Sequence, residues 1–245
     1  MLDTGWGSMP AGARAIEHRA AEEHDFRPDF KALNGMLGEA KPRAVFLCNP
    51  NNPTGYLTPQ EALDGIRNAA GDALLVLDEA YQTFIEAGRS TLRFDEQASV
   101  IYLRSMTKDY GLPGLRLGYA AGPADIIDNL RKVLPPWNVN APAQAAGAWV
   151  LDRDAALKQS LKKLRTARDY LMRETAALGF TVMPSEANYF LVKVGNGAAC
   201  RRDLLKHGIM VRDCASFGLP AYVRIAARAL PDCRRLVTAL KRLTK

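Results

Sequence analysis

The residues with the clearest chemical potential lie around Lys108, in the stretch SMTKDYGLPGLRLGY at residues 105–119. Lysine side chains are usually solvated at the surface. Here Ser105 precedes the lysine by three positions and Arg116 follows it by eight, within a run of glycines and apolar residues. A desolvated lysine beside another cation has a depressed pKa, so its neutral amine can attack a carbonyl carbon. We therefore expect Lys108 to lie in a desolvated pocket and to act as a nucleophile.

Polar residues also follow two other apolar runs. Asn52 belongs to the turn sequence NPNNPTG and can offer its amide to a ligand. Asp78 and Glu79 end the run ALLVLDEAY, where a carboxylate is costly unless it is paired. Asp78 can hold a cationic ring nitrogen through a charge-assisted hydrogen bond. Tyr81 can donate its phenol to a nearby oxygen.

Together these side chains match the chemical groups of one cofactor. Ser105 and Arg116 suit a phosphate, and Lys108 suits an aldehyde. Asp78 suits a ring nitrogen, and Tyr81 suits a phenolic oxygen. These four groups occur together in pyridoxal 5'-phosphate. The alternative for each residue taken singly is a solvated lysine, a surface ion pair, an N-cap or an ordinary turn.

Short apolar runs alternate with amphipathic stretches in the first part of the chain. We expect buried strands over residues 44–50, 73–81, 99–105 and 115–122, and helices that open at a capping box (TPQE, residues 58–61) and at Pro123. This alternation predicts an α/β fold with a mostly parallel sheet that helices cover on both faces. Ligands bind such sheets beyond the strand ends, so Asn52, Asp78 and Lys108 are expected along one edge.

The pattern changes near residue 150. A long helix is expected over residues 154–178, and it is followed by the strand-like runs FTVMPSEANYFLVKV, IMVRDC and AYVRIAAR with helices between and after them. These elements predict a small α+β domain. We therefore divide the chain into a partial large domain, residues 1–150, and a small C-terminal domain, residues 151–245.

Composition narrows the classes of protein. The 245 residues are 48% hydrophobic and 24% charged, as in ordinary globular domains. The net charge of +7 is dispersed apart from helical stretches, which we assign to solvated helix faces or to attraction for a phosphorylated or carboxylated small molecule, and no nucleic-acid partner is expected. No apolar stretch reaches membrane-spanning length, so we expect a soluble cytoplasmic protein. The four cysteines and three histidines show no metal-binding spacing, and no metal is expected.

Four motifs, in order, resemble those of the class I/II aminotransferases, which are pyridoxal-phosphate enzymes of fold type I: NPNNPTG, LDEAYQTF, SMTKDYGLPGLRLGY and YVRIAAR. Three further stretches, LPPWNVNAPAQAA, EANYFLV and GIMVRDCASFGL, are similar to the branch that holds histidinol-phosphate aminotransferase and threonine-phosphate decarboxylase. The resemblance runs from about residue 25 to the C-terminus. It implies a pyridoxal-phosphate-binding large domain, here truncated, and a small C-terminal domain.

The resemblance also implies roles for single residues. Lys108 resembles the lysine that forms a Schiff base with the cofactor, and Asp78 resembles the partner of the ring nitrogen. Tyr81 and Asn52 resemble the groups that hydrogen-bond the phenolic oxygen. Ser105 and Arg116 resemble the ligands of the cofactor phosphate.

On the substrate side, Arg224 resembles the arginine that grips the α-carboxylate, and Asn188 an asparagine near that carboxylate. Arg212 resembles a residue that meets the distal, often phosphorylated, end of the substrate. Asn52 is expected to contact the substrate as well. The implied partners are an amino donor, a keto acid and a second copy of the chain in a homodimer.

Members of the family carry a segment before the position that matches about residue 10. It includes an arm, a glycine- and serine-containing loop that binds the cofactor phosphate, an aromatic residue that stacks on the ring, and a tyrosine that reaches the neighbouring subunit. We find no equivalent and expect weakened cofactor affinity and weak or absent turnover.

Three functions stay open. The leading one is a pyridoxal-phosphate-dependent aminotransferase acting on an amino acid or amino-alcohol phosphate that resembles histidinol phosphate. The tryptophan in PPWNVN favours a second, threonine-phosphate decarboxylase of cobalamin biosynthesis. The third is a non-catalytic fragment that serves only as an interaction or dimerisation module.

Overall fold

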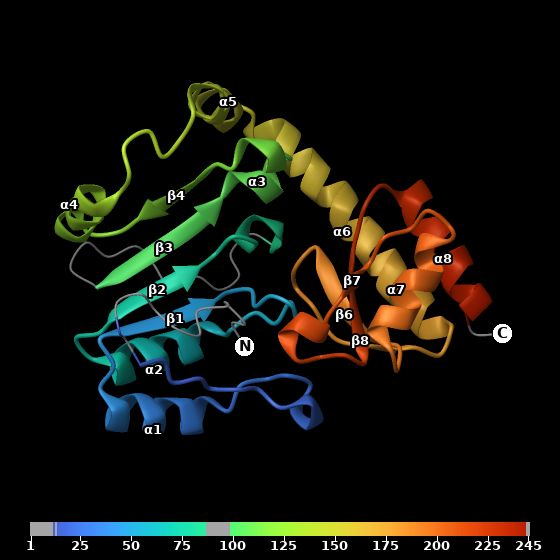
Figure 1. Ribbon diagram of the computed structural model, residues 1–245, viewed down its shortest axis with the longest axis horizontal. Helices are drawn as coiled ribbons and strands as arrows, with labels where there is room; N and C mark the ends of the chain where they lie inside the picture. The colour runs from blue at the N-terminus through green and yellow to red at the C-terminus, as the bar shows by residue number, and fades with distance from the viewer. Residues whose placement is uncertain (1–11, 13, 87–98, 244–245) are drawn as a thin grey trace. The chain divides into compact units, whose positions relative to one another are not determined.

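The computed structural model describes residues 12, 14–86 and 99–243. It divides into two compact units, each described here by itself (Figure 1). The sheet-A unit comprises Asp29–Pro50 and Leu57–Gln159, and the sheet-B unit comprises Asn51–Tyr56, Ser160–Lys245 and the described part of Met1–Pro28. This division assigns most of the NPNNPTG turn to the sheet-B unit. The domain boundary at residue 150 stays a prediction of the sequence.

Sheet A has four strands in the order β1-β2-β3-β4. The strands are β1 (Ala44–Cys48), β2 (Leu74–Asp78), β3 (Val100–Ser105) and β4 (Gly118–Ala121). The first three run parallel, and β4 runs antiparallel to β3. The expected mostly parallel sheet is therefore confirmed. The strand β4 runs antiparallel because its connection from β3 holds only the short helices α3 (Met106–Asp109) and η3 (Pro113–Leu115) and no long crossover helix.

The helices of this unit are α1 (Phe30–Ala40), α2 (Gln60–Ala70), α3 (Met106–Asp109), α4 (Ala124–Val133) and α5 (Ala141–Leu151). Helices α1 and α2 lie on one face of sheet A (Figure 1). Alternate strand residues point to that face, and the core that results consists of Leu37, Leu63, Ile66, Leu75, Leu77, Val100 and Tyr102.

The opposite face of sheet A is less completely covered. Phe46 of β1 and Leu103 of β3 point away from the α1–α2 core, and their exposed fractions are 48% and 37%. The expectation that helices cover both faces is thus only partly met among the described residues.

The start of α2 differs from the expected capping box. The helix begins at Gln60, and Pro59 is its N-cap instead of its first residue. The carbonyl oxygen of Pro59 accepts hydrogen bonds from the amides of Ala62 and Leu63, at 3.1 and 3.0 Å. A proline has no side-chain acceptor, so the cap here is made by the backbone.

The sheet-B unit has four antiparallel strands in the order β5-β6-β8-β7. The strands are β5 (Thr181–Val182), β6 (Tyr189–Lys193), β7 (Arg212–Asp213) and β8 (Tyr222–Ala226), and the helices are α6 (Asp154–Ala177), α7 (Gly197–Leu205) and α8 (Leu230–Leu243). Helix α6 begins in the other unit at its first residues. The predicted α+β character of this region is confirmed.

The two faces of sheet B have different environments. Phe190, Val192, Val223 and Ile225 point to one face, where they join a core with residues of α6, α7 and α8. Because side chains alternate along a strand, Tyr189 on β6 and Arg224 on β8 point to the other face. Sheet B therefore holds the side chains of Tyr189 and Arg224 on the face away from its main core.

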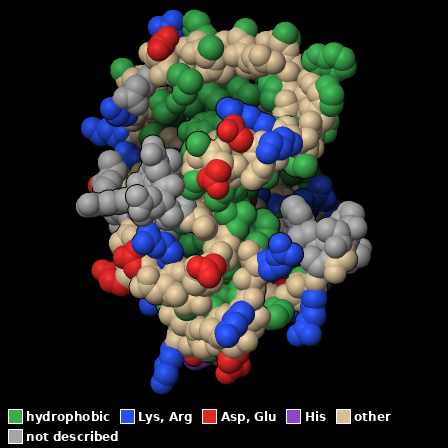
Figure 2. All heavy atoms as spheres, turned by 90° about the vertical axis from the view of Figure 1, so that its left-hand side faces the viewer, with side chains coloured by type: hydrophobic (Ala, Val, Ile, Leu, Met, Phe, Trp, Pro, Cys, Tyr) green, Lys and Arg blue, Asp and Glu red, His purple; other side chains and the backbone are tan. Residues whose placement is uncertain are grey.

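Large hydrophobic side chains are exposed on α4, on α5 and on the loop between these helices. Figure 2 shows hydrophobic side chains gathered in the upper part of the face that it presents. The exposed large hydrophobic residues in this region are Leu130, Val133, Leu134, Trp137, Trp149 and Leu151. Trp137 is 96% exposed. No helix in the described parts of the chain is long and apolar enough to cross a bilayer.

Candidate functional site

The predicted site residues fall into two groups, one in each unit. The lysine group, in the sheet-A unit, comprises Asp78, Tyr81, Ser105, Lys108 and Arg116. The arginine group, in the sheet-B unit, comprises Asn52, Asn188, Arg212 and Arg224.

The lysine group lies at the carboxyl ends of two neighbouring parallel strands. Asp78 is the last residue of β2 and pairs in register with Leu103 of β3, two residues before Ser105. Lys108 follows on α3, directly after β3. The sequence predicted that the acid and the amine follow strand ends at one edge of the sheet, and the parallel pairing of β2 with β3 agrees with this. Asn52, the third polar residue expected at this edge, belongs to the sheet-B unit instead.

The amine of Lys108 is held by its neighbours. Its Nζ donates a hydrogen bond to Ser105 Oγ at 3.1 Å and lies 5.8 Å from the centre of the Tyr81 ring. The side chain is exposed, so the expected desolvated pocket is wrong for this chain as described. The reason is local: α3 is a single short helical turn, and Met106 and Thr107 take its buried positions.

A hydroxyl that the sequence analysis overlooked extends this arrangement. Ser105 Oγ and Thr107 Oγ1 lie 2.7 Å apart and share a hydrogen bond. Thr107 is buried, and Ser105 is partly buried. The motif SMTK contained the signal, because a second hydroxyl directly before the lysine is within reach of the first.

The carboxylate of Asp78 is fixed from its own segment. Its Oδ1 accepts a hydrogen bond from the backbone amide of Ala80 at 3.0 Å. A carboxylate offers two oxygens, so Oδ2 can receive a further proton donor. The backbone carbonyl of Asp78 accepts from the amide of Asn49 at 2.9 Å, which ties the end of β2 to the end of β1.

Arg116 reaches the same end of the sheet through the pairing of β3 with β4. Ser105 pairs with Gly118, two residues beyond Arg116, and a Cβ atom on Gly118 would lie only 2.6 Å from the carbonyl oxygen of Arg104. Only glycine therefore fits this position. The guanidinium of Arg116 is exposed and donates to the carbonyl of Pro113 at 3.2 Å.

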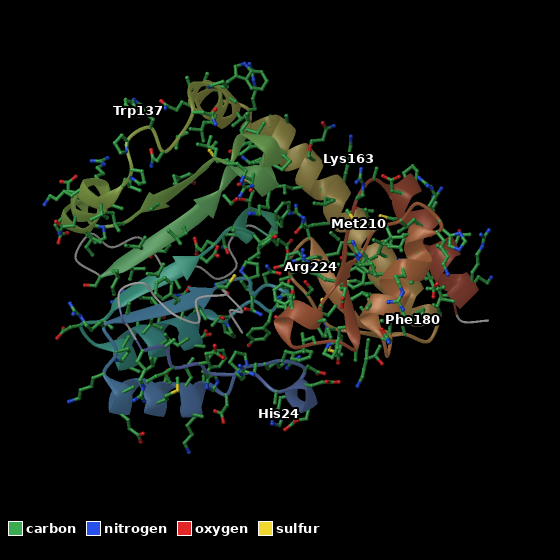
Figure 3. The ribbon with its side chains drawn as sticks, viewed as in Figure 1. His24, Trp137, Lys163, Phe180, Met210 and Arg224 are labelled. Atoms are coloured by element: carbon green, nitrogen blue, oxygen red, sulfur yellow. The ribbon has the colours of Figure 1, made fainter. Side chains whose placement is uncertain are left out.

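The arginine group centres on Arg224 of β8, which is labelled in Figure 3. Its Nη1 donates a hydrogen bond to Oδ1 of Asn52. Its guanidinium carbon lies 4.8 Å from the centre of the Tyr189 ring, a cation–π distance. Tyr189 is a second residue that the sequence analysis missed, although it adjoins Asn188 in the motif EANYF.

The loop that carries Asn52 is attached to sheet B at two points. The hydroxyl of Tyr189 donates to the carbonyl of Asn51 at 3.0 Å, and the amide of Glu186 donates to the carbonyl of Gly55 at 2.9 Å. Gly55 has a φ of +73°, and a Cβ atom there would meet the side chain of Ser185. The glycine therefore permits both the turn and its close approach to the sheet.

Arg212 lies beside Arg224. The two are register partners on the antiparallel strands β7 and β8. The Nη2 of Arg212 donates to Ser216 Oγ at 3.0 Å, and its guanidinium carbon lies 5.6 Å from the centre of the Phe217 ring. Both side chains thus point to the same face of sheet B.

Asn188 lies at the start of β6, beside the end of β8. Its backbone carbonyl accepts from the amide of Ala227 at 2.9 Å. Its Oδ1 atom is buried and has no hydrogen-bond partner among the described residues. A buried amide oxygen without a partner is costly, which makes it a candidate for contact with a ligand.

The sequence matches the family profile of aminotransferase class I and II over residues 2–243. It is 35% identical over 236 residues to histidinol-phosphate aminotransferase 1 of Thiobacillus denitrificans, an alignment that covers 94% of this chain and 60% of that relative. The chain thus spans about three fifths of the length of that curated relative.

Two solved structures show the same fold. One is histidinol-phosphate aminotransferase from Sinorhizobium meliloti in complex with pyridoxal-5'-phosphate, with a TM-score of 0.83, 27% identity, and coverage of 95% of this chain and 65% of that one. The other is L-threonine-O-3-phosphate decarboxylase from Porphyromonas gingivalis, with a TM-score of 0.73, 28% identity, and coverage of 81% and 63%.

Proposed function

Because the chain belongs to the aminotransferase class I and II family, we propose that it is a pyridoxal-phosphate-dependent aminotransferase. Its substrate in this proposal is an amino acid or amino-alcohol phosphate that resembles histidinol phosphate. The lysine group holds the cofactor, and the arginine group holds the substrate. The observation that carries the substrate class is the register pairing of Arg212 with Arg224.

The donor set of the lysine group fits the cofactor. The amine of Lys108 is exposed and therefore accessible to an aldehyde. The hydroxyls of Ser105 and Thr107 and the guanidinium of Arg116 are the kinds of donor that a phosphate requires. The carboxylate of Asp78 has an oxygen with which to receive a ring N–H.

When bound, pyridoxal phosphate supplies an aldehyde carbon for an amine and a protonated ring that accepts an electron pair. The Nζ atom of Lys108 holds the cofactor covalently and, when it is free, accepts and returns a proton. Ser105 Oγ orients that amine through the 3.1 Å hydrogen bond. Asp78 keeps the ring nitrogen protonated, and the phenol of Tyr81 donates to the phenolic oxygen.

The arginine pair indicates a substrate with two anionic groups. Like charges directly opposite each other on paired strands are destabilising. Arg224 and Arg212 are such neighbours, and a carboxylate and a phosphate bound between them would offset the repulsion. In this proposal Arg224 binds the α-carboxylate, Arg212 binds the phosphate, and the side-chain N–H groups of Asn52 and Asn188 donate to the carboxylate.

A second candidate is decarboxylation of threonine phosphate, which also carries both anionic groups. The likeness to the solved decarboxylase and the tryptophan at position 137 favour it. The same residues would support either reaction, because in both they would hold the cofactor and the two anionic groups of the substrate. A keto product supports the first candidate, and release of carbon dioxide supports the second.

Homodimer formation and a cytoplasmic location are further parts of the proposal. The exposed side chains on and between α4 and α5, among them Val133 and Trp137, supply an apolar surface that a second copy could bury. The third candidate, a non-catalytic interaction module, would use this surface without the lysine group.

The test uses the chain loaded with pyridoxal phosphate. Addition of histidinol phosphate should bleach the visible absorption of the bound cofactor as its amine form accumulates, and a keto acid should restore the absorption. The variant Arg212→Gln should require at least tenfold more histidinol phosphate, because it loses a charge-assisted contact with the phosphate, whereas its response to a non-phosphorylated amino acid should be unchanged. Equal responses of Arg212→Gln and wild type to both amines would contradict the substrate assignment.

A further inference from the structure

Two side-chain bridges join the segments that carry the lysine group, and neither uses a predicted site residue. Thr83 Oγ1 donates a hydrogen bond to Asp109 Oδ2 at 3.0 Å. Arg104 Nη2 forms an ion pair with Glu79 Oε2 at 2.6 Å. Glu79 and Thr83 lie in the segment that follows β2. Arg104 lies at the end of β3, and Asp109 is the last residue of α3. The bridges therefore fasten one strand end to the next.

Each bridging residue is close in sequence to a residue of the lysine group. Glu79 follows Asp78, and Asp109 follows Lys108. Consecutive Cα atoms are about 3.8 Å apart, so a restraint on Asp109 also restrains the backbone of Lys108. This matters because α3 is only one turn long and cannot hold its own position through internal hydrogen bonds.

The bridges are not what stability alone would favour. The side chain of Glu79 is fully buried, and burial raises the pKa of Asp109 against the opposing effect of the hydrogen bond from Thr83. Buried carboxylates of this kind are weak evidence for stability, because apolar residues often replace them without loss. What a hydrogen bond or an ion pair between two segments does supply is a specific arrangement of the segments that it joins.

We propose that Asp109 and Thr83 are positioning residues for Lys108. The hydrogen bond between Thr83 and Asp109 fixes the lysine amine relative to Tyr81 and Ser105. The use of that amine rests on the proposed function. The positioning itself does not, because it can be measured on the chain without cofactor.

The measurement is the pH profile of amine labelling. The cofactor-free chain is labelled with a trace of acetic anhydride at a series of pH values, and the acetylated fraction of Lys108 is read by peptide mass spectrometry. In the wild type, the contacts with Ser105 and the Tyr81 ring should slow the reaction of this amine. In Asp109→Ala and Thr83→Val the amine should react on the order of fivefold faster, the effect of losing one hydrogen bond.

Conservative variants separate the hydrogen bond from charge and from general stability. Asp109→Asn and Thr83→Ser keep an acceptor and a donor, so their profiles should match the wild type. The double variant of Thr83→Val and Asp109→Ala should react no faster than either single variant, because both remove the same contact. Lys132 on α4 serves as the internal control in every sample, and Asp128→Ala, on the same exposed helix, is the matched variant.

Two results would overturn the proposal. Unchanged labelling of Lys108 in Asp109→Ala, with a lowered melting temperature, would make the bridge structural only. An Asp109→Asn profile equal to that of Asp109→Ala would mean that charge acts on the amine and the hydrogen bond does not. Failure of the wild type to bind pyridoxal phosphate would contradict the proposed function, but the labelling profiles would still decide the role of Asp109.

Discussion

The lysine group and the arginine group differ in how the chain brings them together. Lys108 contacts Ser105, three residues earlier, and both belong to one continuous motif. Arg224 contacts Asn52, 172 residues earlier, and Tyr189 contacts Asn51, 138 residues earlier. The contact between Ser105 and Lys108 is therefore encoded locally, whereas the contacts of the second group exist only after sheet B has formed and the loop at residues 51–56 has attached to it.

The groups also differ in their exposure to water. Lys108 is exposed, whereas Arg224 is partly buried between an aromatic ring and an amide. Water and salt screen charges at exposed positions more than at buried ones. We therefore expect substitutions of the arginine group to cost more binding free energy than polar substitutions around the lysine.

The largest effect on stability is expected from the ion pair between Arg104 and Glu79. Arg104→Met should leave the buried carboxylate of Glu79 without its partner and lower the free energy of unfolding by about 3 kcal/mol, as for other broken buried pairs. Asp128→Ala, which breaks the exposed pair with Arg131, should change it by less than about 1 kcal/mol. Urea denaturation measures both. Equal losses would show that the two ion pairs do not differ as their burial implies.

Arg224→Gln should separate the two groups functionally. Loss of the charged fork should weaken binding of a phosphorylated amino acid by about 30-fold or more, since truncating a hydrogen-bonded charge costs roughly 2 kcal/mol or more. Covalent attachment of pyridoxal phosphate to the lysine group should be unchanged. Titration followed by the visible absorption of the cofactor tests both statements. A variant that loses cofactor attachment as well would break the distinction.

Tyr189→Phe tests whether attachment of the loop at residues 51–56 to sheet B matters for substrate binding. It removes the donor to the carbonyl of Asn51 but keeps the ring under Arg224. The expected loss in the free energy of unfolding is about 1 kcal/mol, with a smaller loss of substrate affinity. The control is Tyr170→Phe on α6, whose ring contacts Arg173. If the loop attachment matters, only the Tyr189 variant should weaken substrate binding.

The smallest expected effect concerns the pH dependence at Asp109. Burial raises the pKa of this carboxyl in the folded chain, so the folded state binds its proton more tightly than the unfolded state does. The stability that results is present below the ordinary carboxyl pKa and is lost as the pH rises through the raised value. Relative to Asp109→Asn, the wild type should therefore become less stable as the pH increases from acid toward neutral. A difference that is independent of pH, in urea denaturation at several pH values, would contradict this.

The sequence predicted most of the fold because apolar runs and their breaks are local signals. The strands β1, β2 and β3 begin and end within a few residues of their predicted bounds, and the long helix α6 was placed almost completely. The antiparallel direction of β4 was not predicted, because a strand's direction depends on its connection and not on its own residues. Helices α1 and α5 were also missed.

The functional roles of the predicted site residues stay predictions, but their positions in the fold can be compared with the structure. The predicted strand ends placed Asp78 and Lys108 at one edge of the sheet without any knowledge of tertiary contacts, and the pairing of β2 with β3 agrees with this. The expected desolvation of Lys108 failed because burial depends on what packs around α3. Tyr189 and the bridge between Thr83 and Asp109 went unnoticed because such contacts join residues that no motif contains together.

The central claim is that the amine at position 108 is the one that binds pyridoxal phosphate covalently. The most direct measurement is reduction of the cofactor-loaded chain with borohydride, followed by peptide mapping of the fixed cofactor. The account predicts that the label lies on Lys108 alone, that Lys108→Ala carries none, and that Lys132→Ala is labelled like the wild type. Label on any other lysine, or equal labelling of Lys108→Ala and the wild type, would contradict it.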